Sequence, residues 1–114
     1  MPVWCTLPVS EQGELALRNW KVLQLPNGER HLIGYCVENR EGRVSSVVRE
    51  IDYGSLTAVT RAGRKYVLHG LPGVDLDAQH VWKRWAAFNA VRSWEDVTCT
   101  VWSMHESSRS QVTR

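Results

Sequence analysis

The chain has 114 residues, of which 43% are hydrophobic and 23% are charged, and its formal net charge at pH 7 is +2. This length favours one domain with one core, and so small a net charge argues against a polyanion as the main partner. No run of about 20 apolar residues could span a membrane, and three widely spaced cysteines are typical of a reduced, cytoplasmic protein. We therefore expect a cytoplasmic protein without a membrane segment.

The amino-terminal half predicts strands. Residues 2–9 contain two prolines in a short apolar run, which favours an arm or an edge strand. Residues 10–17 predict a short helical turn or a loop. Alternating apolar residues then predict a strand over 19–25, and residues 31–38 are apolar on both faces, which is typical of a central strand. A turn leads into a long strand over 43–51, so these last two strands form a hairpin.

The second half adds shorter strands around one helix. Strands are expected over 56–61 and 65–69, giving an antiparallel meander of about five to six strands that is strongly curved or barrel-like. Residues 97–102 predict a final strand, with Val97, Cys99 and Val101 facing the core. Residues 103–114 are polar and aperiodic, which predicts a loose tail after a single domain over residues 1–102.

The main helix is expected over residues 75–91. Val81, Trp85 and Phe88 follow one another at i, i+4 and i+7, so they predict the apolar stripe that faces the core, with Trp82 toward its flank. The fold class is therefore α+β, with this helix packed on one face of the sheet.

Four segments carry a family resemblance: Leu17-Arg18-Asn19-Trp20-Lys21-Val22, Leu32-Ile33-Gly34-Tyr35, Gly42-Arg43-Val44-Ser45-Ser46 and the run from Arg61 to Gly70. In this order they resemble small uncharacterised bacterial proteins carried on mobile elements, including integron gene cassettes. The resemblance covers about residues 17–72 and rests on a strand pattern with a few turn residues. It implies an accessory, non-housekeeping role and assigns no site residues.

Metal and cofactor chemistry finds no support in the spacing of the ligand-type residues. None of the histidines and cysteines forms a Cys-x-x-Cys, a His-x-x-x-His or another close pair, although structural zinc sites use such pairs. These residues are His31, His69, His80, His105, Cys5, Cys36 and Cys99. Convergence of Cys36, His69 and Cys99 in space stays open, but core packing explains them better. We expect no metal and no cofactor.

Nucleophilic and phosphate-binding motifs are also missing. Ser45 and Ser46 lie in an expected strand without the Gly-x-Ser-x-Gly elbow, and no cysteine has a histidine beside it. The turn over residues 70–73 precedes the helix, where free amides attract anions. Asp75 and Asp77 already occupy that positive pole and would repel phosphate. We expect no catalytic residue from these motifs.

The aromatic residues are the unusual part of the composition, with six Trp in so short a chain. Trp20 is expected to face the helix from the sheet, whereas the remaining Trp residues outnumber what one small core can hold. Exposed aromatics mark a homodimer interface, a protein partner or a ligand pocket, which we favour in that order. The expected binding residues are Trp4, Tyr66, Trp82, Trp94 and Trp102.

Basic residues interleave with these aromatics, which is typical of single-stranded nucleic-acid binders. The expected basic patch is Arg61, Arg64, Lys65, Lys83 and Arg84. However, the sequence isoelectric point of 8.6 is below the value of about 9 that such domains usually exceed. We therefore expect a non-enzymatic accessory binding protein that self-associates; the alternatives are a small enzyme whose site assembles in space and a single-stranded nucleic-acid binder.

Overall fold

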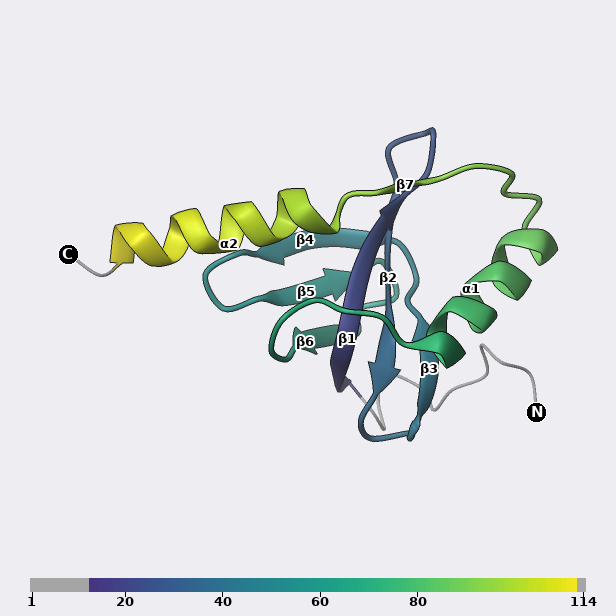
Figure 1. Ribbon diagram of the computed structural model, residues 1–114, viewed down its shortest axis with the longest axis horizontal. Coiled ribbons are helices and arrows are strands. Elements are labelled where there is room, and N and C mark those ends of the chain that lie inside the picture. Colours follow the sequence, from purple (N-terminus) through teal and green to yellow (C-terminus); the bar gives the residue numbers. More distant parts are fainter. Residues whose placement is uncertain (1–12, 113–114) are drawn as a thin grey trace.

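The computed structural model describes the backbone of residues 13–112 and the side chains of residues 13–108. It has the expected α+β fold, with the main helix packed on a curved sheet (Figure 1). The expected arm over residues 2–9, with Trp4 and Cys5, lies outside the described residues. The elements are β1 (Glu14–Gln24), β2 (Arg30–Cys36), β3 (Glu41–Val44), β4 (Val48–Asp52), β5 (Thr57–Thr60), β6 (Lys65–Leu68), α1 (Leu76–Phe88), β7 (Glu95–Asp96) and α2 (Thr98–Val112).

The sheet is mixed and open rather than a purely antiparallel meander or a closed barrel. Its strand order is β3-β2-β1-β6-β5-β4, and β7 pairs with the end of β1. The other pairs are antiparallel, but β1 and β6 run parallel, with residues 14–17 beside residues 65–68. This pairing makes a strand of residues that were expected in a turn or loop. The parallel pairing joins segments that lie about 50 residues apart in the sequence, so no local sequence pattern predicts it.

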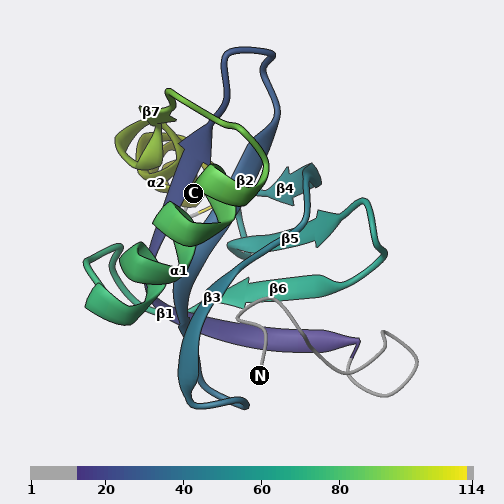
Figure 2. The ribbon, with the colours of Figure 1, turned by 90° about the vertical axis from the view of Figure 1, so that its right-hand side faces the viewer.

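A bulge in β1 gives the sheet its curvature. Asn19 and Trp20 together lie opposite Gly34, and Asn19 has a φ of 47°. Gly34 is needed there, because a Cβ at this position would lie 3.0 Å from the carbonyl oxygen of Arg18. Bulges bend a strand and increase its twist, and Figure 2 shows the sharp bend of β1. Residues 14–17 of β1 therefore pair with β6 and residues 23–24 pair with β7, whereas β2 pairs with β1 on both sides of the bulge.

Two hydrophobic cores lie on opposite faces of the sheet. The core under α2 contains Trp20, which is fully buried with its ring centroid 6.3 Å from that of Trp102. The core under α1 contains Ile33 and Trp82. The expectation that Trp20 faces the main helix is therefore wrong, and the two cores hold more Trp than the single core assumed from the sequence.

The main helix is confirmed, but its rotation differs from the expected one. Ala78, Trp82 and Ala86 are buried at i, i+4 and i+8, and Val81 is buried beside them. In contrast, Trp85 is half-buried and Phe88 is 74% exposed. The prediction that Trp85 and Phe88 belong to the buried stripe is therefore wrong. The buried side of the helix is rotated from the predicted side by about the angle between two successive residues.

Close docking on β3 explains this rotation. Asp75 caps α1 by accepting a hydrogen bond from the Ala78 amide at 2.9 Å, whereas the carboxylate of Asp77 accepts one from the Gly42 amide on β3. A Cβ on Gly42 would overlap the backbone of Asp77 and Ala78. The first turn of α1 thus rests directly on β3 and fixes which side of the helix is buried.

The carboxy-terminal part is a helix, so two predictions for it are wrong. Residues 98–112 form α2 instead of a final strand over 97–102 followed by a loose tail. Val97, Val101 and His105 are buried, whereas Cys99 is exposed. This spacing of four residues is helical, and the apolar alternation at Val97, Cys99 and Val101 imitates a strand only over a short stretch. The domain therefore extends beyond residue 102.

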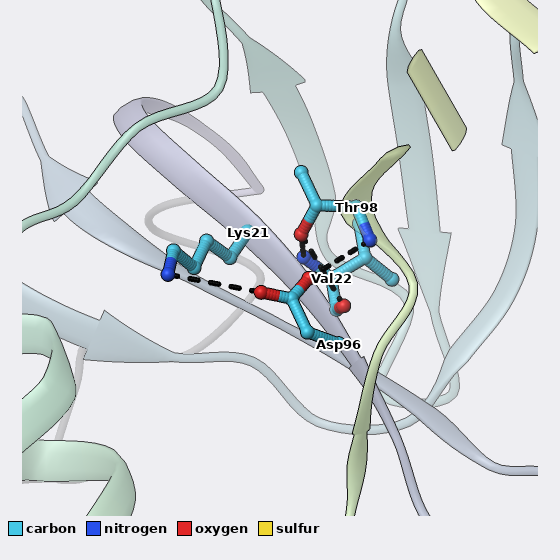
Figure 3. A network of polar contacts seen from close by, with 4 residues as sticks. All are labelled: Lys21, Val22, Asp96 and Thr98. Atoms are coloured by element: carbon cyan, nitrogen blue, oxygen red, sulfur yellow. Dashed lines mark hydrogen bonds and ion pairs between the residues drawn. The ribbon is translucent and has the colours of Figure 1, made fainter. Parts of the chain in front are cut away.

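A polar network holds the start of α2 against β1 (Figure 3). The Thr98 hydroxyl accepts a hydrogen bond from the Val22 amide at 3.0 Å, and Asp96 accepts one from the Thr98 amide at 3.0 Å. Lys21 Nζ lies 3.7 Å from Asp96 Oδ2. Burial alone raises the pKa of Asp96, but the Thr98 hydrogen bonds and the Lys21 ammonium outweigh it and hold that pKa below its ordinary value.

The long strand expected over residues 43–51 is interrupted. β3 ends at Val44 and β4 begins at Val48, and residues 45–47 carry the chain from one edge of the sheet to the other. The hairpin of β2 and β3 is confirmed, with Ile33 opposite Val44. Strands at the two ends of the sheet order are thus joined by three residues, and this connection borders the groove described next.

Candidate functional site

A groove of about 340 Å³ opens where three elements meet. The end of β3 and the β3–β4 connection supply residues 43–46, and the β5–β6 hairpin supplies residues between Thr60 and Tyr66. The last turn of α1 and its cap supply Trp85, Phe88 and Asn89. We call this space the Arg43 groove.

Arg43 is a buried cation that faces this groove. Its side chain is 7% exposed, and its Nε donates a hydrogen bond to Tyr66 Oη at 2.8 Å. Among the described residues the guanidinium forms no ion pair, and its two terminal nitrogens form no hydrogen bond. Arg43 therefore lines the groove with two terminal nitrogens that form no hydrogen bond among the described residues.

The described lining of the groove is cationic. It contains no acidic residue, and Arg64, which is 6% exposed, belongs to it with Arg43. The Ser45 hydroxyl donates to the Ser46 carbonyl at 2.7 Å, and the Thr60 hydroxyl donates to the Arg64 carbonyl at 3.2 Å. These two hydroxyl protons are already used, so Ser45 and Thr60 offer no hydroxyl donor to an anion in the groove.

Aromatic side chains form the other wall. Trp85 stacks on Trp82 with a centroid distance of 5.0 Å and an interplanar angle of 19°, and its ring lies 4.5 Å from that of His31. Phe88 follows on the next turn, and Tyr66 closes the floor below Arg43. The groove therefore combines a fixed cation with aromatic surface.

His31 supports this wall from behind. It is 2% exposed, and its Nδ1 lies 2.8 Å from the carbonyl oxygen of Ser45. A carbonyl oxygen only accepts hydrogen bonds, so Nδ1 carries the proton and donates. Burial lowers the pKa of His31, which keeps the ring neutral near pH 7. One neutral ring thus contacts Trp85 and anchors the β3–β4 connection.

A second groove of about 280 Å³ lies on the other side of Trp82, beside Lys21, Lys83 and Trp94. Trp94 is 39% exposed, and its ring meets that of Trp82 edge-on at 5.3 Å. The buried Trp82 Nε1 has no hydrogen-bond partner among the described residues. The lining here mixes lysines with Asp96, so it lacks the uniform charge of the Arg43 groove.

The expected aromatic binding residues separate in the structure. Tyr66 lines the Arg43 groove, whereas Trp94 lines the second groove. Trp82 is 2% exposed, but it belongs to the lining of the second groove together with Trp94. Trp102 is half-buried against Trp20, and Trp4 lies outside the described residues.

The expected basic residues do not form one patch. Arg61 is ion-paired with Glu29 at 3.0 Å, and Arg64 is buried in the Arg43 groove. Lys65 is exposed on β6, where it lines a hollow of about 420 Å³ together with Glu50 and Asp52. Lys83 lines the second groove and Arg84 is exposed on α1. This dispersion weakens the reading as a nucleic-acid binder.

Sequence reasoning missed Arg43 as a site residue. Its signal was an arginine in a strand between Gly42 and Val44, which looks like an edge charge when the partner strand is unknown. Only the curvature of the sheet brings β3 across to Tyr66 on β6.

The ligand-type residues are scattered. Among the described residues, no three His, Cys, Asp or Glu side chains lie close enough together to hold a metal ion. Cys36 is buried, and burial raises the pKa of its thiol, whereas His69 and Cys99 are exposed. These three side chains therefore do not share a site.

Comparison with known proteins adds no family. No family model, curated protein or solved structure matches this chain. Within the described part of the chain, neither helix has the length and apolar character needed to cross a membrane.

Proposed function

We propose that this chain is a non-enzymatic binding protein that holds a small organic anion in the Arg43 groove. The observation that carries the proposal is the buried side chain of Arg43, which lines the groove and forms no ion pair among the described residues. Removing a charge from water costs several kcal/mol unless an opposite charge compensates it. A bound acid group would supply that charge.

Hydrogen bonds from Arg43 should add substantially to the affinity for an anion. Hydrogen bonds to charged groups contribute about 1.5–3 kcal/mol, which corresponds to roughly ten- to a hundredfold in affinity. Tyr66 holds Nε, so the guanidinium is oriented before a ligand arrives. Orientation in advance reduces the entropy lost on binding.

Binding is favoured over catalysis by the state of the groove hydroxyls. Ser45 and Thr60 donate to carbonyl oxygens rather than to a general base, so neither is activated as a nucleophile. An accessory role on a mobile element, supported only by the strand and turn pattern over residues 17–72, is part of the same proposal.

The test uses naphthalene sulfonate, an aromatic anion of two fused rings, and follows its binding by calorimetric titration. We expect saturable binding to the full chain and an at least tenfold loss of affinity in Arg43→Met, which keeps the length and apolar stem of the side chain. Arg49→Met is the matched control. Arg49 is exposed on β4, so this substitution removes the same charge outside the groove. Equal losses in the two folded variants, or no loss in either, would contradict the proposal.

Self-association is a second candidate, favoured by exposed apolar residues just before α1 and at its first position. Leu71, Val74 and Leu76 are 70%, 54% and 77% exposed in one short segment. Such patches mark interaction surfaces. We propose a homodimer through this segment, and sedimentation equilibrium at micromolar concentration should give twice the 13.0 kDa of one chain. A mass of one chain at every concentration would refute it.

A further inference from the structure

The ligand class can be narrowed from the shape and polarity of the Arg43 groove. Resting on the proposed function above, we infer that the ligand is an aryl carboxylate of one or two rings, with its acid group on the terminal nitrogens of Arg43 and its ring against Trp85 and Phe88.

Size sets the first limit. The groove volume of about 340 Å³ is near the lower end of the range of about 300–1,000 Å³ that small-molecule pockets occupy. One or two fused rings with a single acid group suit this volume, whereas a nucleotide or a longer chain extends beyond it.

The donor geometry selects a planar acid. Nε of Arg43 already donates a hydrogen bond to Tyr66 Oη. A ligand can therefore accept hydrogen bonds only from the end-on edge of the guanidinium, which the two terminal nitrogens form. Two parallel N–H groups on this edge match the two oxygens of a carboxylate.

The surroundings disfavour a phosphate dianion. The groove is bordered by the carboxy-terminal end of α1, at Phe88 and Asn89, where the helix dipole is negative. No helix amino terminus lines the described groove, and the hydroxyl protons of Ser45 and Thr60 are committed to carbonyl oxygens. A monovalent acid with two acceptor oxygens is therefore better matched than a dianion with three.

The aromatic wall selects a flat ring. Trp85 is held in place by stacking on Trp82 and by contact with His31, so its position is set before a ligand binds. Phe88 extends this wall toward solvent. Aromatic pairs contribute about 0.5–1.5 kcal/mol beyond the area that they bury, which equals roughly two- to tenfold in affinity.

Calorimetric titration of the full chain with four matched probes tests the inference. The probes are naphthoate, its saturated analogue decalin carboxylate, naphthyl phosphate and the neutral alcohol naphthyl methanol. We expect naphthoate to bind most tightly, two- to tenfold better than the saturated acid, and the alcohol to bind at least tenfold more weakly. Trp85→Leu should reduce the preference for the aromatic ring to about one. Phe88 is exposed, so Phe88→Ala should fold and should reduce the preference for the aromatic ring in part. This variant replaces Trp85→Leu in the test if Trp85→Leu does not fold.

Each outcome separates this inference from the proposed function. Equal affinity for naphthoate and the saturated acid, with both lost in Arg43→Met, would overturn the aromatic class and leave anion binding intact. Tighter binding of naphthyl phosphate than of naphthoate would overturn the inference that the acid group is a carboxylate. Binding of all four probes without any effect of Arg43→Met would overturn both proposals.

Discussion

Replacing Trp82 by alanine tests how α1 is rotated on the sheet. The Trp82 side chain is 2% exposed between β2 and the rings of Trp85 and Trp94. Truncating a large buried aromatic costs about 3–5 kcal/mol, because transfer energy is lost and a cavity remains. Phe88, on the same helix, is 74% exposed, so Phe88→Ala should change stability by no more than about 0.5 kcal/mol. Trp85→Ala should lie between them.

Urea unfolding followed by circular dichroism measures these differences. Domains of this kind have about 5–15 kcal/mol of stability, so the Trp82 loss should shift the midpoint strongly with an unchanged slope. Trp82→Phe should cost less than Trp82→Ala, since it fills much of the space and removes the indole N–H that lacks a partner among the described residues. Equal losses for Trp82→Ala and Phe88→Ala, or a larger loss for Phe88→Ala, would refute the observed helix rotation.

Three further predictions follow from buried contacts. Burial lowers the pKa of His31, so the unfolded chain takes up this proton at a higher pH than the folded chain does. The contribution of His31 to stability should be complete above about pH 6.5 and should decline as the pH falls toward the folded-state pKa; unfolding at several pH values should show less of this decline in His31→Gln, and an identical decline would contradict the assignment. Gly42→Ala should cost about 1–3 kcal/mol in urea unfolding, because its Cβ would push the first turn of α1 off β3, and an unaltered midpoint would mean that α1 does not rest there. Deleting residues 104–114 removes His105, whose Nδ1 lies 2.6 Å from the Tyr53 carbonyl, and should lower stability by about 1 kcal/mol or more; a truncated chain as stable as the full one would restore the loose tail.

Local signals predicted the elements that depend on neighbouring residues. The β2–β3 hairpin followed from alternation on both sides of a turn, and α1 followed from the helical spacing of Val81, Trp85 and Phe88. The second helix was missed because Val97, Cys99 and Val101 alternate like a strand and the following residues are polar. Its packing on β1 through Thr98 is a tertiary contact that the sequence pattern does not contain.

The candidate site was predictable only in part. Tyr66 and Arg64 were selected because basic and aromatic residues interleave, and both line the groove. Arg43 was missed because its role depends on the bend of β1, which brings β3 across to β6. The buried face of α1 was misjudged because several large aromatics follow one another on the helix, and the choice among them is made by close docking at Gly42.

A crystal structure of the full chain grown with naphthoate would test the central proposal most directly. The carboxylate oxygens should lie about 2.7–2.9 Å from the two terminal nitrogens of Arg43, the usual range for such charged hydrogen bonds, with the ring against Trp85. Naphthoate bound instead in the groove beside Trp94, or with its carboxylate turned away from Arg43 into solvent, would contradict the account.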